Sequence, residues 1–278
     1  MRHSYVLVQF LLAMENSESE SSAVPSRKPP VALVLINRPE DGPRILSLEP
    51  EDLRLLKQVL NWAGYQSFIV DIDDDVDRIN DAVVLYKPTV IINLVEQMFG
   101  DVWQAPAVAA MLDLFGYVYT GSEPSVLLDC LDWAKVQVLL EHAGLPLCNG
   151  RGTRRLHACL LGNDEVELLP IGESVVLEGQ PVIAQDTTTS IVSARIEHLA
   201  WQVWDVLGLR DIAQIDFDVS LAGRVSITGV TAAVDIFGTV FRTAAAGREG
   251  GMPGTIVRLS RLCHERLSAE ELVAHPLP

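Results

Sequence analysis

The segment Val31–Asn37 is apolar almost throughout, and this run constrains the fold of the chain more than any other feature. A strand of this kind is typical of a sheet that is buried on both faces. Pro50 then begins an amphipathic helix that Gly64 ends, and further strands are predicted at Ser67–Ile72 and Thr89–Leu94. This alternation of strands and helices predicts an α/β region with a parallel sheet.

The second half of the chain has a different pattern, in which short strands follow one another. The remaining predicted elements are helices Gln104–Phe115 and Ser125–Ala143, strands Leu156–Leu161, Glu165–Pro170, Ser174–Leu177 and Pro181–Gln185, a helix from Arg195 to Leu207, a hairpin of Gln214–Val219 with Arg224–Val230, and a helix around Ile256–Leu267. Such runs of strands indicate an α+β region. We expect the boundary between the two regions near residues 146–152.

Four segments follow from this pattern: a tail at 1–30, an α/β domain at 31–122, a helical connection at 123–150 and an α+β domain at 151–278. Residues 15–30 are rich in Ser, Glu and Pro, which predicts a disordered tail. The short apolar run Tyr5–Met14 leaves a signal sequence as an alternative. An acidic stretch follows it without a clear cleavage motif, so a cytoplasmic protein is the preferred interpretation.

The formal net charge of −16 argues against nucleic acids and anionic membranes as partners, because both bind positive surfaces. No apolar stretch has the length of a membrane span. The four cysteines do not have the spacing of a zinc site or a disulfide framework, so we expect buried, reduced thiols. Cys148 lies in a loop flanked by Pro and Gly, and it is the only cysteine for which we consider a reactive thiol.

Common catalytic and phosphate-binding motifs are absent from the sequence. It has no Gly-x-Gly-x-x-Gly, no Gly-x-x-x-x-Gly-Lys and no His-x-x-x-His, so the usual phosphate loops and helical zinc sites are not predicted. The acidic cluster between Asp71 and Asp77 suggests calcium. An EF-hand counted from Asp71 would have Val76 and Ala82 where Gly and a bidentate acid are required, and a solvated loop is the favoured interpretation.

One aspartate, Asp216, lies where a magnesium ligand would be useful. Carboxylates on two paired strands can hold Mg²⁺ against phosphates, because this ion prefers hard oxygen ligands. The strand predicted to pair with that of Asp216 offers Gly229 and Thr231 and no acid. Asp216 is therefore isolated, and a single carboxylate is a poor site for a metal–nucleotide complex.

The order of several short motifs resembles the D-alanine–D-alanine ligase branch of the ATP-grasp superfamily. The resemblance covers most of residues 31–270. The motifs are Asn93-Leu94-Val95-Glu96, Gln104-x-Pro106, Tyr119-Thr120-Gly121-Ser122, Asp132, Ala143-Gly144-Leu145-Pro146, Leu161-Gly162-Asn163, Leu207-Gly208-Leu209-Arg210-Asp211 and Asp216-Phe217. The resemblance implies a Rossmann-like, pre-ATP-grasp substrate domain, then a helical entrance to an α+β ATP-grasp domain, and a ligase that uses ATP and Mg²⁺.

The departures from the family pattern fall on the residues that handle ATP. Trp133 and Gln137 stand where the family has lysines, and Gln214 stands where it has an arginine. The family's Glu-x-Asn metal motif aligns with Gly229 and Thr231, which leaves Asp216 as a vestigial metal position. Residues 147–159 replace a segment of several dozen residues that holds a further lysine, a loop over the phosphates and an adenine-binding strand. The resemblance thus implies a truncated ATP-grasp domain.

Three hypotheses follow. The first is a degenerate, non-catalytic homologue that acts as an interaction, regulatory or small-ligand-binding protein, without a cofactor. The second is an active ATP- and Mg²⁺-dependent carboxylate–amine ligase with relocated or partner-supplied ligands; its candidate phosphate-binding cations are Lys135, Arg151, Arg154 and Arg155. The third is a subunit that pairs with a complete ATP-grasp paralogue or with itself. The same losses would also follow from a misassembled gene. The first hypothesis is preferred because the lost cations and metal ligands all stabilise phosphoryl transfer.

Overall fold

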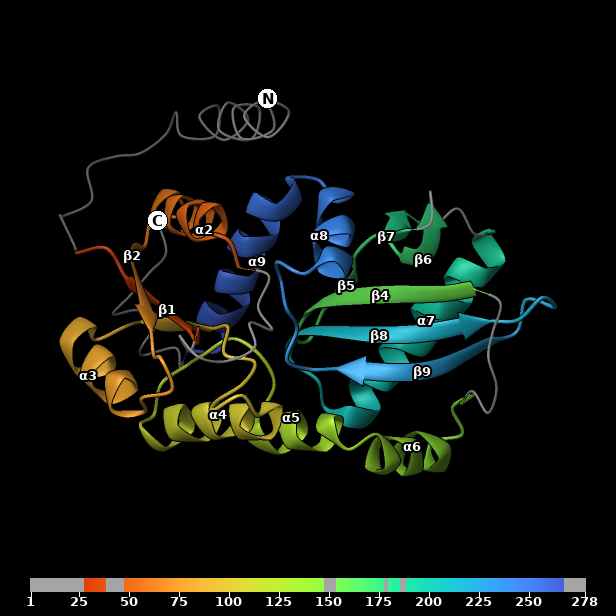
Figure 1. Ribbon diagram of the computed structural model, residues 1–278, viewed down its shortest axis with the longest axis horizontal. Coiled ribbons are helices and arrows are strands. Elements are labelled where there is room, and N and C mark those ends of the chain that lie inside the picture. Colours follow the sequence, from red (N-terminus) through yellow and green to blue (C-terminus); the bar gives the residue numbers. More distant parts are fainter. Residues whose placement is uncertain (1–27, 39–47, 148–153, 178–179, 186–188, 268–278) are drawn as a thin grey trace.

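The structure is a computed structural model that describes residues 28–38, 48–147, 154–177, 180–185 and 189–267. Two sheets organise these residues, one in each half of the chain (Figure 1). Cys148 and Arg151, both singled out from the sequence, lie outside the described residues.

The first sheet is parallel and has the strand order β2-β1-β3, with β1 at Val31–Ile36, β2 at Gln66–Asp71 and β3 at Val90–Asn93. The α/β prediction for this half is confirmed, and each strand begins and ends within one residue of the prediction. Helix α2 (Pro50–Trp62) begins at a proline, and the side chain of Asp52 accepts a hydrogen bond from the backbone N–H of Glu49 at 3.0 Å.

The helices α3, α4, α5 and α6 differ more from the sequence prediction. Their bounds are Asp77–Tyr86, Ala105–Leu114 (after the 3₁₀ turn η1, Val102–Gln104), Pro124–Leu131 and Trp133–His142. Helix α3 was not predicted. The single helix expected at Ser125–Ala143 is wrong, because Asp132 leaves helical geometry and its carboxylate caps α6 by accepting from the N–H groups of Ala134 and Lys135.

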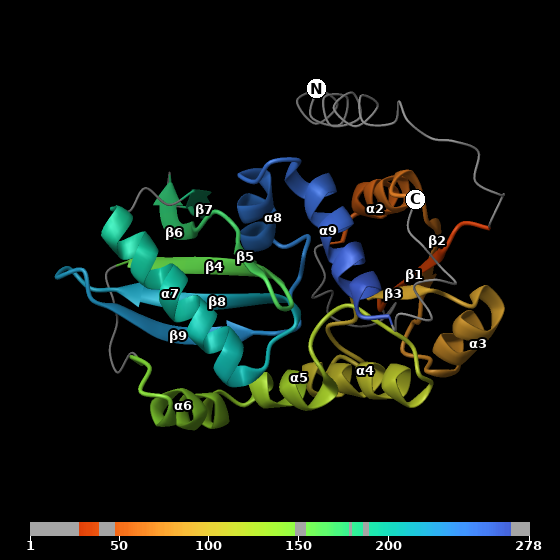
Figure 2. The same ribbon diagram turned by 180° about the vertical axis from the view of Figure 1, so that it is seen from behind.

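The second sheet is antiparallel, with the order β7-β6-β4-β8-β9, and β5 pairs with β4. The bounds are β4 Arg154–Gly162, β5 Val166–Leu168, β6 Gly172–Leu177, β7 Gln180–Gln185, β8 Asp211–Val219 and β9 Val225–Thr231. Helix α7 (Ser190–Leu207) lies across one face of this sheet (Figure 2). The α+β prediction is thereby confirmed, although α7 begins earlier than expected.

Helices α8 (Thr239–Ala246) and α9 (Gly251–Glu265) lie on the other side, and α9 packs against both α2 and α8 (Figure 1). Helix α8 was not predicted. Residues of strand β4 alternate between the two faces, as the pleat requires: Leu156, Ala158 and Leu160 pack with α7, whereas Cys159 and Leu161 pack in the cluster that contains α8 and α9. The site described below occupies this second face.

Both hydrophobic clusters contain residues of both sheets, so one continuous packing joins the two halves of the chain. None of the helices in the described part of the chain has the length and apolar character needed to cross a bilayer. The domain divisions and the cytoplasmic location stay predictions.

Candidate functional site

His157 and Asp216 lie directly opposite each other on the paired strands β4 and β8. Opposite residues of an antiparallel pair project to the same face, and here Nδ1 of His157 lies 2.8 Å from Oδ1 of Asp216. An ionised carboxylate only accepts hydrogen bonds, so Nδ1 carries the proton and donates. The other ring nitrogen, Nε2, is then an acceptor in the neutral imidazole.

Ser174 completes a row of three polar side chains. It lies on β6, diagonally across from His157, because the register pairs His157 with Gly172 and Arg155 with Ser174. Its Oγ is 2.7 Å from Nε2 of His157, so the hydroxyl donates to the imidazole. The side chain of His157 is only 7% exposed, whereas Ser174 is exposed and borders a cavity of about 490 Å³. We call this the Ser174 cavity.

The surroundings of Asp216 do not fit magnesium. The side-chain amide of Gln214 donates to the same Oδ1 at 2.9 Å, so this oxygen already has two partners. Gly229 lies opposite Asp216 on β9, and a Cβ there would come within 3.3 Å of Oδ2; Thr231 lies opposite Gln214. Within the described ranges, no group of three or more His, Cys, Asp or Glu side chains could hold a metal ion.

Trp133 and Gln137, at the positions where the resemblance implies lysines, both lie on α6. Trp133 is partly buried and packs against the larger hydrophobic cluster, and Gln137 is half-buried. An indole and an amide provide no positive charge for phosphates.

Three of the four cations proposed as a substitute phosphate site lie in the described part of the chain, and each is paired with an acid. Lys135 forms an ion pair with Asp129, and Arg155 with Asp218 at 3.3 Å. Arg154 donates to both carboxylate oxygens of Glu173 at 2.6 Å, and this pairing lowers the pKa of that acid. Arg154 and Arg155 belong to strand β4. These paired arginines and lysine are poor candidates for gripping phosphate.

A partly buried acid, Glu96, also borders the Ser174 cavity. Glu96 borders both this cavity and a neighbouring one of about 290 Å³, which extends to Thr120 and Gly121. Burial, with a smaller contribution from Asp235, raises the pKa of Glu96 to about 8. Glu96 is therefore mostly protonated at neutral pH, and its end of the cavity offers a hydrogen-bond donor.

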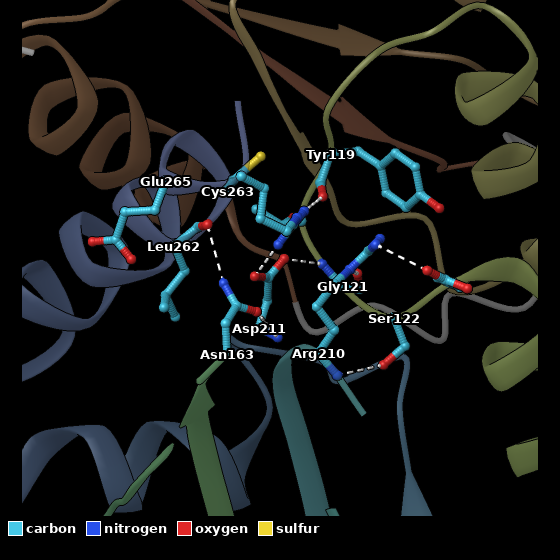
Figure 3. Close-up of polar contacts among 12 residues, drawn as sticks. Tyr119, Gly121, Ser122, Asn163, Arg210, Asp211, Leu262, Cys263 and Glu265 are labelled. Atoms are coloured by element: carbon cyan, nitrogen blue, oxygen red, sulfur yellow. Dashed lines mark hydrogen bonds and ion pairs between the residues drawn. The ribbon is translucent and has the colours of Figure 1, made fainter. Parts of the chain in front are cut away.

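The Thr120-Gly121-Ser122 loop has a structural task. Asp211, which is 0% exposed, accepts from the N–H of Gly121 at 2.8 Å and forms an ion pair with Arg266 (Figure 3). Arg210 donates to the carbonyl of Gly121 at 2.8 Å, and its backbone N–H donates to the hydroxyl of Ser122 at 3.1 Å. We call this group of Gly121, Ser122, Arg210, Asp211 and Arg266 the junction, because it joins the loop between α4 and α5 to β8 and to the end of α9.

Three cysteines are in the described part of the chain, and all are free thiols. Cys159 and Cys263 are buried, and Cys130 is partly buried. Burial raises the pKa of Cys130 and of Cys263 to about 12, so both remain protonated thiols at neutral pH. The expectation of buried, reduced thiols is confirmed for Cys159 and Cys263, and Cys130 is reduced but only partly buried.

The arrangement of the two sheets and the connecting helices matches solved structures of known enzymes. The D-alanine–D-alanine ligase of Bacillus anthracis in complex with ATP superposes with a TM-score of 0.65 at 10% identity, over 85% of this chain and 98% of that one. The ligase of Coxiella burnetii gives 0.64 at 11% identity, over 85% of this chain and 94% of that one. The chain has the fold of a D-alanine–D-alanine ligase.

Likeness at this level of identity shows the ligase fold and leaves the chemistry open. No protein-family model matches the sequence, and no curated protein matches it. The residues that would give the ligase fold its activity must therefore be judged one by one from their surroundings. By that criterion Asp216 is held by His157 and Gln214, and Gly229, Thr231, Trp133 and Gln137 offer neither a carboxylate nor a positive charge.

Sequence reasoning missed the role of Ser174 and His157. The two residues are separated along the chain and form no motif, and only the register of β4 with both β6 and β8 places them beside Asp216. A weak signal was present in the predicted strands, since a histidine in the middle of an apolar strand requires a polar partner. The sequence did not show which residue that partner was.

Proposed function

We propose that this protein binds a small molecule in the cleft between its two halves and has lost the ATP-dependent ligation that its fold performs elsewhere. One observation carries the proposal. The Asp216 carboxylate, which would be the remaining metal ligand, is bound by His157 and Gln214, and in the part of the chain that the structure describes it belongs to no group of three or more His, Cys, Asp or Glu side chains that could hold a metal ion. Without a metal and free cations, the charge that develops during phosphoryl transfer would not be stabilised.

The cavities support binding of a ligand. The Ser174 cavity, of about 490 Å³, is within the range of small-molecule sites. Val182, Ile183 and Phe241 give it apolar walls, and Glu96 and Asp235 supply polar groups at one end. A ligand with an apolar body and a neutral or positively charged polar end suits this lining better than a triphosphate does.

Isothermal titration of the purified protein with Mg-ATP tests the proposal, with ADP and a non-hydrolysable ATP analogue as further ligands. We expect no heat of binding at millimolar nucleotide. Binding at micromolar affinity, about −8 kcal/mol, would overturn the proposal. The Asp216→Asn variant distinguishes a rebuilt site from incidental binding, because a site that uses Asp216 for Mg²⁺ would lose affinity in this variant.

A second function, an ATP- and Mg²⁺-dependent ligase with ligands supplied by a partner, is favoured by the likeness of the fold to a ligase solved with ATP. In this case the chain would pair with a complete ATP-grasp paralogue or with a second copy of itself. Sedimentation of the chain alone and mixed with such a paralogue measures pairing. A ligase assay of the mixture with D-alanine then tests this function. A mixture no more active than the paralogue alone would exclude it.

A further inference from the structure

We propose that Ser174, His157 and Asp216 act as a nucleophilic relay that hydrolyses a small carboxylic ester bound in the Ser174 cavity. The three side chains are joined in series, with Oγ of Ser174 2.7 Å from Nε2 of His157 and Nδ1 of His157 2.8 Å from Oδ1 of Asp216. This is the connectivity by which a base activates a serine hydroxyl while a carboxylate fixes the tautomer of that base.

The burial of the three groups differs in the way such a relay needs. His157 is almost completely enclosed, so its ring is held in one orientation by its two hydrogen bonds. Ser174 is exposed and borders the cavity, so a substrate can reach its Oγ. Gln214 donates to Asp216 and holds the carboxylate in place. A purely structural polar cluster would not require its outermost hydroxyl to line a cavity.

The start of helix α8 borders the same cavity as Ser174. Helix α8 begins at Thr239 after Gly238, which has no side chain to cap the helix, and Gly238, Thr239, Val240 and Phe241 all border the cavity. The first N–H groups of a helix have no partner within the helix, and they lie at its positive end. The start of α8 is therefore the candidate source of backbone donors to a negative oxygen, beside the Asp235 carboxylate, whose Oδ2 would lie 3.0 Å from a Cβ at Gly238.

The lining of the cavity indicates the class of substrate. Val182, Ile183 and Val240 favour an apolar acyl group, and burial keeps Glu96 mostly protonated at neutral pH. Lys and Arg are absent from this lining among the described residues, so a substrate carboxylate would have no ionic partner there. An uncharged ester with a short apolar acyl chain fits these features.

The reaction balances with water as the only co-reactant. Oγ of Ser174 forms a bond to the ester carbonyl carbon, and its proton passes to Nε2 of His157. The bond from the carbonyl carbon to the alkoxy oxygen then breaks, and the alcohol leaves with the proton from Nε2. Water attacks the acyl-serine, its proton passes through Nε2 to Oγ, and the carboxylic acid is released. Asp216 stays ionised and acts as a positioning residue.

Labelling with diisopropyl fluorophosphate tests the nucleophile directly. In this reaction the Oγ–P bond forms, the P–F bond breaks, fluoride leaves and Nε2 takes the proton. Mass spectrometry should locate one adduct on Ser174 in the wild type and in Ser190→Ala, an exposed serine at the start of α7. Ser174→Ala should give no adduct. No adduct on Ser174 in the wild-type protein would overturn the proposal.

Hydrolysis of p-nitrophenyl acetate tests the other two groups. His157→Asn keeps a donor toward Asp216 but removes the base, and we expect its labelling and hydrolysis rates to fall about 1,000-fold. Asp216→Asn should lower kcat with little change in KM, because it affects orientation and not binding. Rates unchanged in Ser174→Ala would overturn the relay. This variant is at an exposed position, so the test remains decisive even if His157→Asn fails to fold.

The test of the relay does not depend on ATP binding. ATP binding tests the proposed function instead. Nucleotide binding by the wild-type protein would contradict the proposed function and leave the labelling of Ser174 to be judged separately. Absence of both nucleotide binding and labelling would support a binding protein and reject the hydrolase.

Discussion

Asp211 and Asp216 belong to one strand, β8, yet their carboxylates are held in different ways. Asp211 is 0% exposed and is bound by the Arg266 guanidinium and the N–H of Gly121. The side chain of Asp216 is 28% exposed and is bound by His157 and Gln214. The buried carboxylate of Asp211, opposite a cation, serves to hold the structure together. The carboxylate of Asp216 orients an imidazole and leaves Nε2 of that imidazole available for chemistry.

The partners of the two aspartates also come from different places. The junction around Asp211 connects a loop of the first half of the chain with α9, so its contacts span the two sheets (Figure 3). The relay around Asp216 lies within one sheet and opens to a cavity. We therefore expect substitutions at the junction to affect stability and substitutions in the relay to affect reactivity. Four predictions follow, from the largest effect to the smallest; the first and the last compare the junction with the relay, and the two between them set the scale with a packing residue and a cavity acid.

The largest effect is expected for Asp211→Asn. The substitution leaves the Arg266 guanidinium next to a neutral amide in a buried site, which costs roughly 3 kcal/mol or more. Urea denaturation measures the loss in the free energy of unfolding. Glu265→Gln, which removes an exposed partner of Arg258, is the control and should cost less than about 1 kcal/mol. Similar losses in both variants would mean that the junction is not special.

The next largest loss of stability is expected for Trp133→Lys, because this substitution removes packing from the larger hydrophobic cluster. Exchanging a partly buried indole for an ammonium group should cost about 2 kcal/mol. Val138→Lys on the same helix is the control, since Val138 is 64% exposed and its change should stay within about 0.5 kcal/mol. A Trp133→Lys protein as stable as the wild type would show that the indole has no structural role.

The pH dependence of stability should reveal Glu96. Its folded-state pKa, about 8, lies above its ordinary value of 4.5, so the folded protein binds the proton more tightly than the unfolded chain. The favourable contribution is complete below pH 4.5 and is lost as the pH rises to about 8. Glu96→Gln should therefore gain stability relative to the wild type across this window, on the order of 2 kcal/mol. A difference that does not change with pH would show that Glu96 is solvated.

The strands of the first half of the fold were predicted well because they contain apolar runs. Such runs are typical of strands in a sheet that is covered on both faces. Val31–Ile36 is buried along almost its whole length, and its neighbours were found to within one residue. Helix α3 was missed because its acidic start was interpreted as a loop. The break at Asp132 was missed because the apolar pattern continues on both sides of it, and only the capping geometry divides the helix.

The candidate site could be predicted only in part. The predicted hairpin of Gln214–Val219 with Arg224–Val230 is confirmed, and it places Gln214, Asp216 and Gly229 together on the paired strands β8 and β9. It did not point to Ser174 or His157, because a contact between strands depends on register and register is set by the packing of a whole sheet. Helix α8, whose start borders the cavity, was hidden in a segment rich in Gly and Ala.

The smallest change in stability is expected for Asp216→Asn, which completes the comparison with the same substitution on the same strand. An asparagine keeps one oxygen that can accept from His157 or Gln214, and the position is partly exposed, so the loss should be about 1 kcal/mol. The measurement is the urea denaturation used for Asp211→Asn. A loss as large as that of Asp211→Asn would mean that Asp216 is also structural, and the distinction between junction and relay would then be wrong. A small loss, combined with a large fall in the labelling of Ser174, is the pattern that a structural polar cluster cannot produce.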